Sequence, residues 1–472
     1  MFSWKQSLSF ICILTACNSD NSSEPTGTRL SVCHVSGGTG TIMEIQLADL
    51  PEHKSHGDYA TTLVVDRLST VGDSIHFTRV TDAVNVARDG RITRGELTKA
   101  ACRITIQVAP GTFKGAVAES TDPTFERYPI VIDVPDITLK GAMVMRLDAN
   151  GRATGDPATG DLTTLTASPV LIVEPSLLSQ PIVVVNGHPQ GSHGDGAVIE
   201  GFLFQTGRIA ADTTIGGQAV LSLRVIGLVV RGNKFEGNFS ETLDLRATSA
   251  IVEKNYLTGR GNTCDICLAG PGEYIARDNR LVGPGGIPGI VSVPATLIPV
   301  PSMVEQWTVP AAATVTATIT NNEVRNHLAR PVGVGIRLGA LGIGASTLVG
   351  TSKITVTGNT LINNTFGMLI EAAFPGGPLR GDIDATITGN TISQSCQNNL
   401  YVSFTRHTTG LGLNSNQPYL RNTTYSLDLG PELPWDGVWY ANPTGFGNTL
   451  SVSGAVIPYG TKHSYDATKV CN

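Results

Sequence analysis

Several short strand-like segments carry charged side chains between apolar ones. In the segment Phe239–Thr248, which reads FSETLDLRAT, Leu243 and Leu245 alternate with Asp244 and Arg246. Successive residues of a strand point to opposite faces, so we expect the leucines in a core and the charged residues outside it. Paired carboxylates with a nearby arginine are what acid/base cleavage of a glycan or calcium-assisted proton abstraction requires.

Three later segments extend this charged set. They read TCDICLAG, VGIRLGA and GMLIEAA, and they contain Asp265, Arg337 and Glu371. If these strands stack, we expect Asp244 beside Asp265, and Arg246 beside Arg337 and Glu371. Carboxylates about 4.8 Å apart would repel unless a proton or a cation such as Ca²⁺ lay between them. The candidate catalytic residues are therefore Asp244, Asp265, Arg246, Arg337 and Glu371. The alternative is a solvated face, because outward residues on any soluble rod must be polar.

A second group of chemically active residues lies near the N-terminus. The segment 32–59 contains Cys33, His34, His53, His56 and Asp58. A thiolate and imidazoles that converge on one point could hold Zn²⁺. The alternative is a small capping module in which Cys33 pairs with another cysteine such as Cys102. The closing PEHKSHGDY resembles the end of a short module found near the start of many exported bacterial surface proteins, although the middle histidine of that module is missing.

Other candidate binding residues are scattered along the chain. The loop 187–195 contains His188, His193 and Asp195, which could bind a metal or move protons. The C-terminal segment contains Trp435 and Trp439, whose rings could stack on sugars. The alternatives are a plain turn for the loop and a cap over the end of the fold for the tryptophans.

The cysteines beyond the N-terminal group leave their pairing open. Cys264 and Cys267 lie three residues apart in one strand, so we expect one packed inside and the other free or paired across coils. Cys396 and Cys471 are plausible partners for each other in an oxidising compartment.

An internal repeat predicts the elements that must position these residues. KITVTGNTLINN at 353–364 and DATITGNTISQS at 384–395 are two copies of a strand, a Gly-Asn turn and a second strand. Looser copies upstream predict a β-solenoid. The turn asparagines should stack and satisfy backbone groups from coil to coil. They are Asn233, Asn255, Asn279, Asn322, Asn359 and Asn390.

The N-terminal side of the repeat predicts a cap. Apolar residues at Val80, Ala83, Val84 and Ala87 form a helical stripe that we expect to end at Asp89-Gly90. The strands that follow, ITIQVAPGTFKGAV and YPIVIDVPDITLKGA, resemble the first coil of the pectin-lyase-like right-handed parallel β-helices. The resemblance covers about 77–408 and implies an all-β chain with a single right-handed parallel β-helix, which we place at 63–410 behind an N-terminal capping helix. The Cys and His residues described above define a small Cys/His module at 30–62. The repeat stops past Arg406, so we expect an irregular C-terminal cap at 411–472.

The same resemblance implies activities on polysaccharides, since many proteins of this type are lyases, hydrolases or epimerases. However, the chain has no Asp-Asp pair with Gly-His-Gly as in polygalacturonases, no Arg-Pro-Trp as in pectin methylesterases and no WIDH as in pectate lyases. We therefore favour a non-catalytic protein that binds a glycan or another surface partner, and we keep polysaccharide lyase, hydrolase or epimerase as the alternative.

The first residues predict export and anchoring. A charged Lys5 precedes the apolar run LSFICILTA, which is typical of an export signal. Leu14-Thr15-Ala16-Cys17 resembles the lipobox of bacterial lipoproteins, which implies a signal peptide at 1–17, an acylated Cys17 and a membrane anchor. Residues 18–29 would be a flexible tether. The absence of aspartate after Cys17 favours the outer membrane or cell surface.

Composition excludes one class of partner. Only 15% of the 472 residues are charged, and the net charge is -6. The chain therefore has no broad basic surface for phosphate backbones, so we expect no nucleic acid partner. The expected partners are a membrane, through the lipid anchor, and a polysaccharide; possible cofactors are Zn²⁺ at the Cys/His module and Ca²⁺ in the groove.

Overall fold

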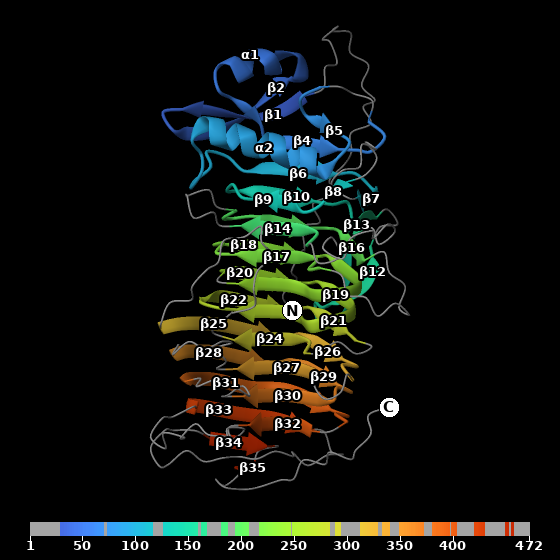
Figure 1. Cartoon of the computed structure of the whole chain (residues 1–472), viewed down its shortest axis with the longest axis vertical. Helices are drawn as coiled ribbons and strands as arrows, with labels where there is room; N and C mark the ends of the chain where they lie inside the picture. Colours follow the sequence, from blue (N-terminus) through green and yellow to red (C-terminus); the bar gives the residue numbers. More distant parts are fainter. Residues whose placement is uncertain are drawn as a thin grey trace, which may run out of the picture.

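The computed structural model is a long rod of stacked coils with a small module at its N-terminal end (Figure 1). The structure describes residues 29–69, 73–116, 126–158, 162–167, 181–186, 194–206, 217–246, 248–283, 288–293, 312–328, 333–339, 349–371, 380–396, 398–403, 420–429, 449–452 and 455–456. In this part of the chain no helix is long and apolar enough to span a bilayer.

Three parallel sheets run along the rod, and we name them A, B and C. Sheet A contains β9 (Ile130–Ile132), β14 (Val183–Asn186), β17 (Val220–Leu223), β24 (Ile290–Val293), β27 (Val334–Gly339), β30 (Phe366–Glu371) and β32 (Asn398–Ser403). Sheet B contains β4 (Thr62–Val65), β6 (Ile104–Val108), β10 (Ile137–Lys140), β15 (Val198–Glu200), β18 (Leu228–Arg231), β20 (Ala250–Glu253), β22 (Gly272–Arg277), β25 (Ala312–Thr320), β28 (Val349–Thr357), β33 (Leu420–Leu429) and β34 (Thr449–Val452). Sheet C contains β7 (Gly111–Ala116), β13 (Thr163–Ala167), β16 (Leu203–Thr206), β23 (Arg280–Val282), β26 (Glu323–Arg325) and β29 (Thr360–Ile362).

Three long strands turn a corner between sheets. β19 (Lys234–Arg246) and β21 (Tyr256–Ala269) run from sheet C into sheet A, and β31 (Arg380–Ser393) runs from sheet B into sheet C. Short strands complete the body: β5 (His76–Phe77), β8 (Glu126–Arg127) and β35 (Ala455–Val456). The chain is thus a right-handed parallel β-helix, as predicted. β33 and β34 continue the stacking beyond residue 410, into the segment predicted to be an irregular cap.

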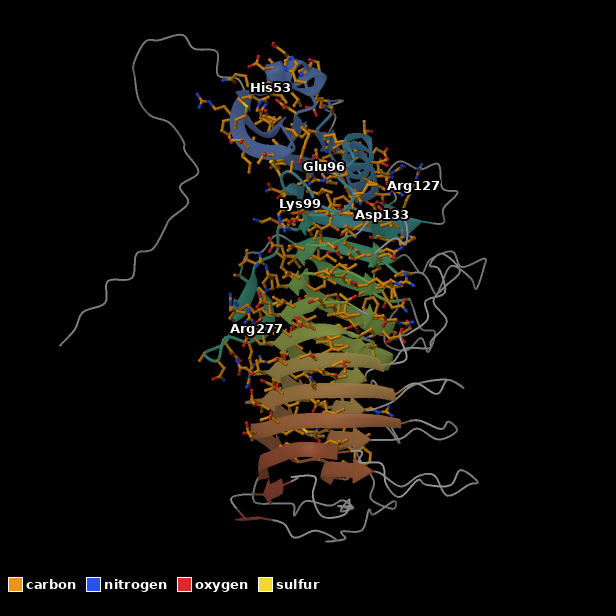
Figure 2. All side chains as sticks on the ribbon, turned by 90° about the vertical axis from the view of Figure 1, so that its left-hand side faces the viewer. His53, Glu96, Lys99, Arg127, Asp133 and Arg277 are labelled. Carbon is orange, nitrogen blue, oxygen red and sulfur yellow. A yellow bond between two sulfur atoms is a disulfide. The ribbon has the colours of Figure 1, made fainter. Side chains whose placement is uncertain are left out.

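Figure 2 shows side chains packed inside the rod, and the strand registers align the apolar ones in columns along the axis. One column of sheet B takes one fully buried residue from each successive strand. It contains Leu139, Ile199, Val230, Val252, Ala276, Ile319, Val356 and Ile387. Parallel strands covered on the inner face read as Val/Ile/Leu-rich segments, which is why the repeat is visible in the sequence.

The N-terminal end is closed by α2 (Val80–Arg94), whose buried residues include the predicted Val80, Ala83, Val84 and Ala87. The helix does not end at Gly90 as predicted but continues to Arg94, because the left-handed residue that stops it is Gly95. Its first turn is capped from a distance: the Glu126 carboxylate accepts hydrogen bonds from the backbone N–H groups of Val80 (2.8 Å) and Thr81 (2.9 Å).

The N-terminal module is a three-stranded antiparallel sheet with one helix. It contains β1 (Arg29–Ser36), β2 (Thr39–Gln46), a 3₁₀ turn (Leu47–Asp49), α1 (Leu50–Ser55) and β3 (Tyr59–Ala60), in the sheet order β2-β1-β3. A separate hairpin of β11 (Met145–Leu147) and β12 (Ala153–Pro157) projects from the early coils.

Candidate functional site

Sheet A holds the predicted charged residues but does not align them as predicted. Asp244 of β19 lies opposite Cys267 of β21, and Leu243 lies opposite Ile266, so Asp244 and Asp265 do not share a column. The pairing of β19 with β21 contains a register shift between Phe239 and Glu241, which no local pattern reveals.

The other predicted columns are also wrong. Arg246 lies opposite Ala269, whereas Arg337 lies opposite Val291, in the column of Asp244 and three strands from it. Glu371 lies opposite Gly339 and next to Ser403 of the following coil. The five residues therefore share a sheet without forming one cluster.

Asp244 and Arg246 form an ion pair with each other. The Arg246 Nε donates to Asp244 Oδ1 at 2.9 Å, and the two side chains are only 2% and 3% exposed for Asp244 and Arg246, respectively. Burial alone would lower the pKa of Arg246, but the Asp244 carboxylate and then the Glu241 carboxylate raise it above its ordinary value. As predicted, Asp244 and Arg246 alternate with the buried Leu243 and Leu245 along the strand. The prediction that the two charged side chains are exposed to water is wrong, because both are buried.

A buried Glu241 joins this pair and was missed from the sequence. It accepts hydrogen bonds from Gln218 Nε2 (3.0 Å) and Ser240 Oγ (2.7 Å). Strand alternation places Glu241 on the same face as the core residues Leu243 and Leu245. The only sequence signal for this site was therefore an acidic residue at a position expected to be apolar.

Asp265 pairs with a histidine that sequence reasoning did not select. Its Oδ2 lies 2.8 Å from Nε2 of His327, which comes from the turn between β26 and β27, and neither side chain is more than 6% exposed. The Nδ1 of His327 lies 3.0 Å from the carbonyl oxygen of Arg325, which can only accept, so Nδ1 carries a hydrogen. One proton is then shared between Nε2 and Asp265, so the Asp265–His327 pair carries no net charge.

A glycine makes room for this contact. A Cβ at Gly289 would lie 2.6 Å from Val324 Cγ1 and 2.9 Å from the Gly335 carbonyl oxygen, and 3.4 Å from His327 Nε2. Gly289, directly before β24, is the sequence feature that marks this contact. It does not identify the histidine, which lies 62 residues from Asp265 in the sequence.

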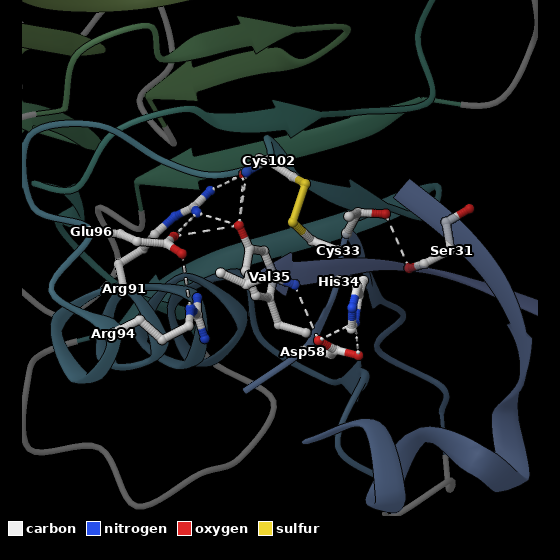
Figure 3. The surroundings of a disulfide bond; sticks show 11 residues. Ser31, Cys33, His34, Val35, Asp58, Arg91, Arg94, Glu96 and Cys102 are labelled. Carbon is white, nitrogen blue, oxygen red and sulfur yellow. Dashed lines mark hydrogen bonds and ion pairs between the residues drawn. A yellow bond between two sulfur atoms is a disulfide. The ribbon is translucent and has the colours of Figure 1, made fainter. Parts of the chain in front are cut away.

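In the N-terminal module the predicted disulfide is confirmed, and the prediction that Cys33 is a thiolate ligand of Zn²⁺ is wrong. Cys33 and Cys102 are bonded across 69 residues of sequence (Figure 3). A sulfur in a disulfide is not available as a thiolate, so Cys33 cannot be a zinc ligand. In the chain-entropy description, closing a loop of this length contributes about 4 kcal/mol to stability.

The histidines of the module surround a carboxylate. Asp58, whose side chain is 1% exposed, accepts hydrogen bonds from Nδ1 of His34 (3.0 Å), Nδ1 of His53 (2.8 Å) and the backbone N–H of Val35 (3.2 Å). His56 is exposed at the end of α1. Among the described residues no three His, Cys, Asp or Glu side chains are grouped so as to hold a metal ion. Of the predicted zinc ligands, His34, His53 and Asp58 form a hydrogen-bonded cluster in this structure.

A second buried network joins the module to the rod (Figure 3). Arg91, which is fully buried, donates to the Tyr59 hydroxyl at 2.7 Å, and that hydroxyl donates to the carbonyl oxygen of Cys102 at 3.1 Å. Glu96 pairs with Arg91 and with Arg94. Burial raises the pKa of Tyr59, which keeps the hydroxyl protonated as a donor. Sequence reasoning did not find this network, because its members come from three separate segments: Tyr59, Arg91 to Glu96, and Cys102.

The remaining predicted residues divide into two groups. Asp195 is described, and its Oδ1 accepts from the backbone N–H of Ile226 at 2.8 Å, which is a turn contact between coils. The others lie outside the described residues: Cys17, His188, His193, Trp435, Trp439 and Cys471.

Cys264 and Cys267 are bonded to each other, contrary to prediction, and Cys396 is disulfide-bonded.

Sheet B presents a regular outward column that we name the polar column. Its first part alternates in charge along successive coils, with Lys140, Glu200, Arg231, Glu253 and Arg277. Arg231 Nε donates to Glu200 at 2.6 Å, and Arg277 Nε donates to Glu253 at 2.7 Å. Its second part contains the threonines Thr320, Thr357 and Thr388, and the hydroxyls of the first two are 3.1 Å apart.

Comparison with known proteins does not identify a family. No protein-family model matches the chain, and no curated protein matches it. Among solved structures, a hyperthermoactive exopolygalacturonase from Thermotoga maritima aligns at 10% identity over 75% of this chain and 77% of its own, with a TM-score of 0.42. A mutant tailspike protein of E. coli bacteriophage HK620 aligns at 14% identity over 87% and 68%, with a TM-score of 0.43. The A-module of a mannuronan C-5 epimerase from Azotobacter vinelandii aligns at 12% identity over 79% and 88%, with a TM-score of 0.39.

Proposed function

We propose that this chain is an exported, lipid-anchored protein of the cell envelope that binds a glycan or another surface partner without cleaving it. The observation that carries the proposal is the neutralisation of the two best candidate carboxylates. Asp244 is paired with Arg246, and Asp265 is paired with His327, and all four side chains are buried.

Acid/base cleavage of a glycan needs two carboxyl groups that reach the scissile bond and exchange protons with it. Asp244 and Asp265 are enclosed with their own partners instead, and each partner lies within 3 Å. Each enclosed pair compensates its own charge, and removal of one partner from such a pair is costly.

The polar column supports a binding role. Neighbouring coils are about 4.8 Å apart, so a polymer that runs along the rod would meet a new donor or acceptor at each coil. Arg231 and Arg277 keep 48% and 44% of their side chains exposed while pairing with glutamates, so their remaining N–H groups can donate to hydroxyls or carboxylates of a sugar.

The anchor and the address are inferred from the N-terminal sequence. The segment ending in Leu14-Thr15-Ala16-Cys17 supports acylation of Cys17, and the residue after it supports an outer-membrane or surface location. Metabolic labelling with an alkyne fatty acid should label the wild-type chain and not Cys17→Ser. Equal labelling of both would refute the anchor.

The binding role is tested by measuring binding and turnover on the same material. The purified protein is incubated with pectin, alginate and glycosaminoglycans, while absorbance of unsaturated products and reducing ends are followed. We expect retardation in glycan affinity electrophoresis without product. The double variant Arg231→Ala, Arg277→Ala should weaken binding at least tenfold, whereas Arg146→Ala on the exposed hairpin should not change it.

The alternative function is a polysaccharide lyase, hydrolase or epimerase. It is favoured by one observation: Glu241, Asp244 and Asp265 lie on two neighbouring strands of sheet A. Product formation that is lost in Asp244→Ala, Asp265→Ala but retained in the Arg231, Arg277 double variant would establish it and overturn the non-catalytic proposal.

A further inference from the structure

The β2 strand forms an open edge of the N-terminal sheet. Within the described part of the chain β2 pairs with β1 alone, and the sheet order β2-β1-β3 leaves its other side without a neighbour. Five of its eight residues are exposed, and Ile42 and Met43 are 62% and 38% exposed. A strand edge presents N–H and C=O groups that pair readily with another strand.

The usual protections of an edge strand are missing. β2 reads TGTIMEIQ, with no lysine and no proline, and all eight of its residues pair in unbroken register with β1. Natural edge strands are commonly short, bulged, or marked by lysine or proline to prevent pairing. β2 is long, regular and carries a single charge, Glu44.

The edge is also held on a rigid support. Gly40 lies over the disulfide, where a Cβ would be 2.6 Å from Cys102 Sγ and 2.7 Å from Cys33 Sγ. The Cys33–Cys102 bond therefore links the hairpin covalently to the segment that precedes β6. A strand that is already ordered binds a second strand at a lower entropic cost.

We propose that β2 is a dimerisation edge that pairs antiparallel with β2 of a second copy of this chain, centred on Ile42. A two-fold axis perpendicular to the sheet keeps directly opposed residues on the same face, so Ile42 meets Ile42 and Thr41 meets Met43. Glu44 then lies opposite Gly40, which keeps the two carboxylates apart. A centre on Glu44 would oppose the carboxylates directly, and a centre on Met43 would place Ile42 against Glu44.

The pairing joins two three-stranded sheets into a six-stranded one. It satisfies the outward backbone groups of both edges and covers the exposed Ile42 and Met43. A second copy fits this edge because the strand, paired with itself about Ile42, brings apolar residues together and keeps the Glu44 carboxylates apart. The proposal is independent of glycan binding, because β2 lies in the module and the polar column lies on sheet B of the rod (Figure 1).

Analytical ultracentrifugation of the full-length chain in detergent tests the oligomeric state. We expect a concentration-dependent dimer, and Ile42→Lys should raise the dissociation constant at least about tenfold, because it removes the apolar pair and opposes two ammonium groups. The matched control is Ile226→Lys, which places the same change at an isoleucine that is 69% exposed on the rod. This control should leave the dimer unchanged.

Cross-linking tests the register. Ile42→Cys should form an interchain disulfide under mild oxidation, because self-paired positions bring their Cβ atoms within reach, whereas Thr41→Cys should not, because it faces Met43. A wild-type chain that stays monomeric, a dimer that is insensitive to Ile42→Lys, or cross-linking of Thr41→Cys in preference to Ile42→Cys would each overturn the proposal.

Discussion

At the scale of single residues, the charged side chains of sheet A lie beside partners from their own or a nearby coil. Asp244 and Arg246 are two positions apart in β19, so they point to the same face of the strand and can pair without help from another element. Asp265 needs His327 from a turn 62 residues away. Both pairs compensate charge in places where water cannot do so.

Loss of one partner should therefore be costly. Asp244→Asn removes the hydrogen-bonded carboxylate of the buried Arg246 guanidinium and leaves only Glu241 to compensate its charge, so we expect the free energy of unfolding to fall by about 3 kcal/mol. Guanidinium unfolding followed by circular dichroism measures this change. The double variant Asp244→Leu, Arg246→Met should recover part of the loss, because it removes both charges of the pair and leaves Glu241 with its hydrogen bonds from Gln218 and Ser240. Asp244→Asn with wild-type stability would show that the pair does not stabilise the fold.

The lowered pKa of Asp58 predicts that the protein loses stability in acid. Burial alone would raise its pKa, but hydrogen bonds from His34, His53 and the Val35 N–H lower the pKa below its ordinary value of 3.8. A lowered pKa in the folded state contributes stability that is fully present above the unfolded pKa and is lost as the pH falls through the folded pKa.

Thermal unfolding from pH 6 down to about pH 2 checks this contribution. The wild-type chain should lose stability below about pH 4, whereas Asp58→Asn should already be less stable at pH 6 and should lose less on acidification. Parallel curves for the two proteins would mean that Asp58 does not make this contribution.

At the scale of elements, the β11–β12 hairpin acts as a strap along sheet C. Arg152 Nε donates to the carbonyl oxygen (2.9 Å) and Oδ1 (3.1 Å) of Asn321, and its Nη2 donates to Thr360 Oγ1 at 3.1 Å. Asp148 pairs with Arg280 at 2.6 Å. The hairpin thus links coils that are more than 130 residues apart in sequence.

Removal of the arginine should release the strap and leave the coils intact. Arg152→Met keeps most of the apolar stem but removes the hydrogen bonds, so we expect faster amide exchange at 145–157 and unchanged exchange in β25 and β28. Hydrogen-exchange mass spectrometry resolves these segments. Arg146→Met, an exposed arginine on the same hairpin, is the control and should change neither. Unchanged exchange at 145–157 in Arg152→Met would contradict the strap.

At the scale of the whole molecule, one line of asparagines runs along the rod. Each Asn Oδ1 accepts from the backbone N–H and the Nδ2 of the preceding asparagine, as Asn359 does from Asn322 (2.9 and 3.0 Å). The line continues through the six predicted residues from Asn233 to Asn390. All six are buried, so the ladder confirms the predicted structural role of the turn asparagines.

An interruption in the middle should weaken the rod as a whole. Asn322→Ala leaves the carbonyl oxygen of Ala276 and the N–H of Asn279 without their partners, and buried groups in that state cost about 1–3 kcal/mol each. We expect the free energy of unfolding to fall by roughly 2–5 kcal/mol in guanidinium unfolding. Thr386→Ala on the exposed face is the control. A variant as stable as the control would show that the ladder contributes little.

The amino-acid sequence by itself determined the β-helix, the asparagine ladder, the apolar stripe of α2 and the Cys33–Cys102 bond as one of two alternatives. The first three features follow from local patterns: the period of two in a strand, the period of a helix and the recurrence of Gly-Asn turns. Each coil repeats the same local solution, so the sequence reveals it many times.

Only the tertiary structure decided which polar groups meet. The register of β19 with β21 placed Asp244 opposite Cys267 and not opposite Asp265, and a turn far along the chain brought His327 to Asp265. The strap contact of Arg152 with Asn321 spans 169 residues. Contacts between residues that are distant in sequence depend on strand register and on the lengths of the intervening loops. A change of one residue in either brings a different side chain to the same position on the sheet.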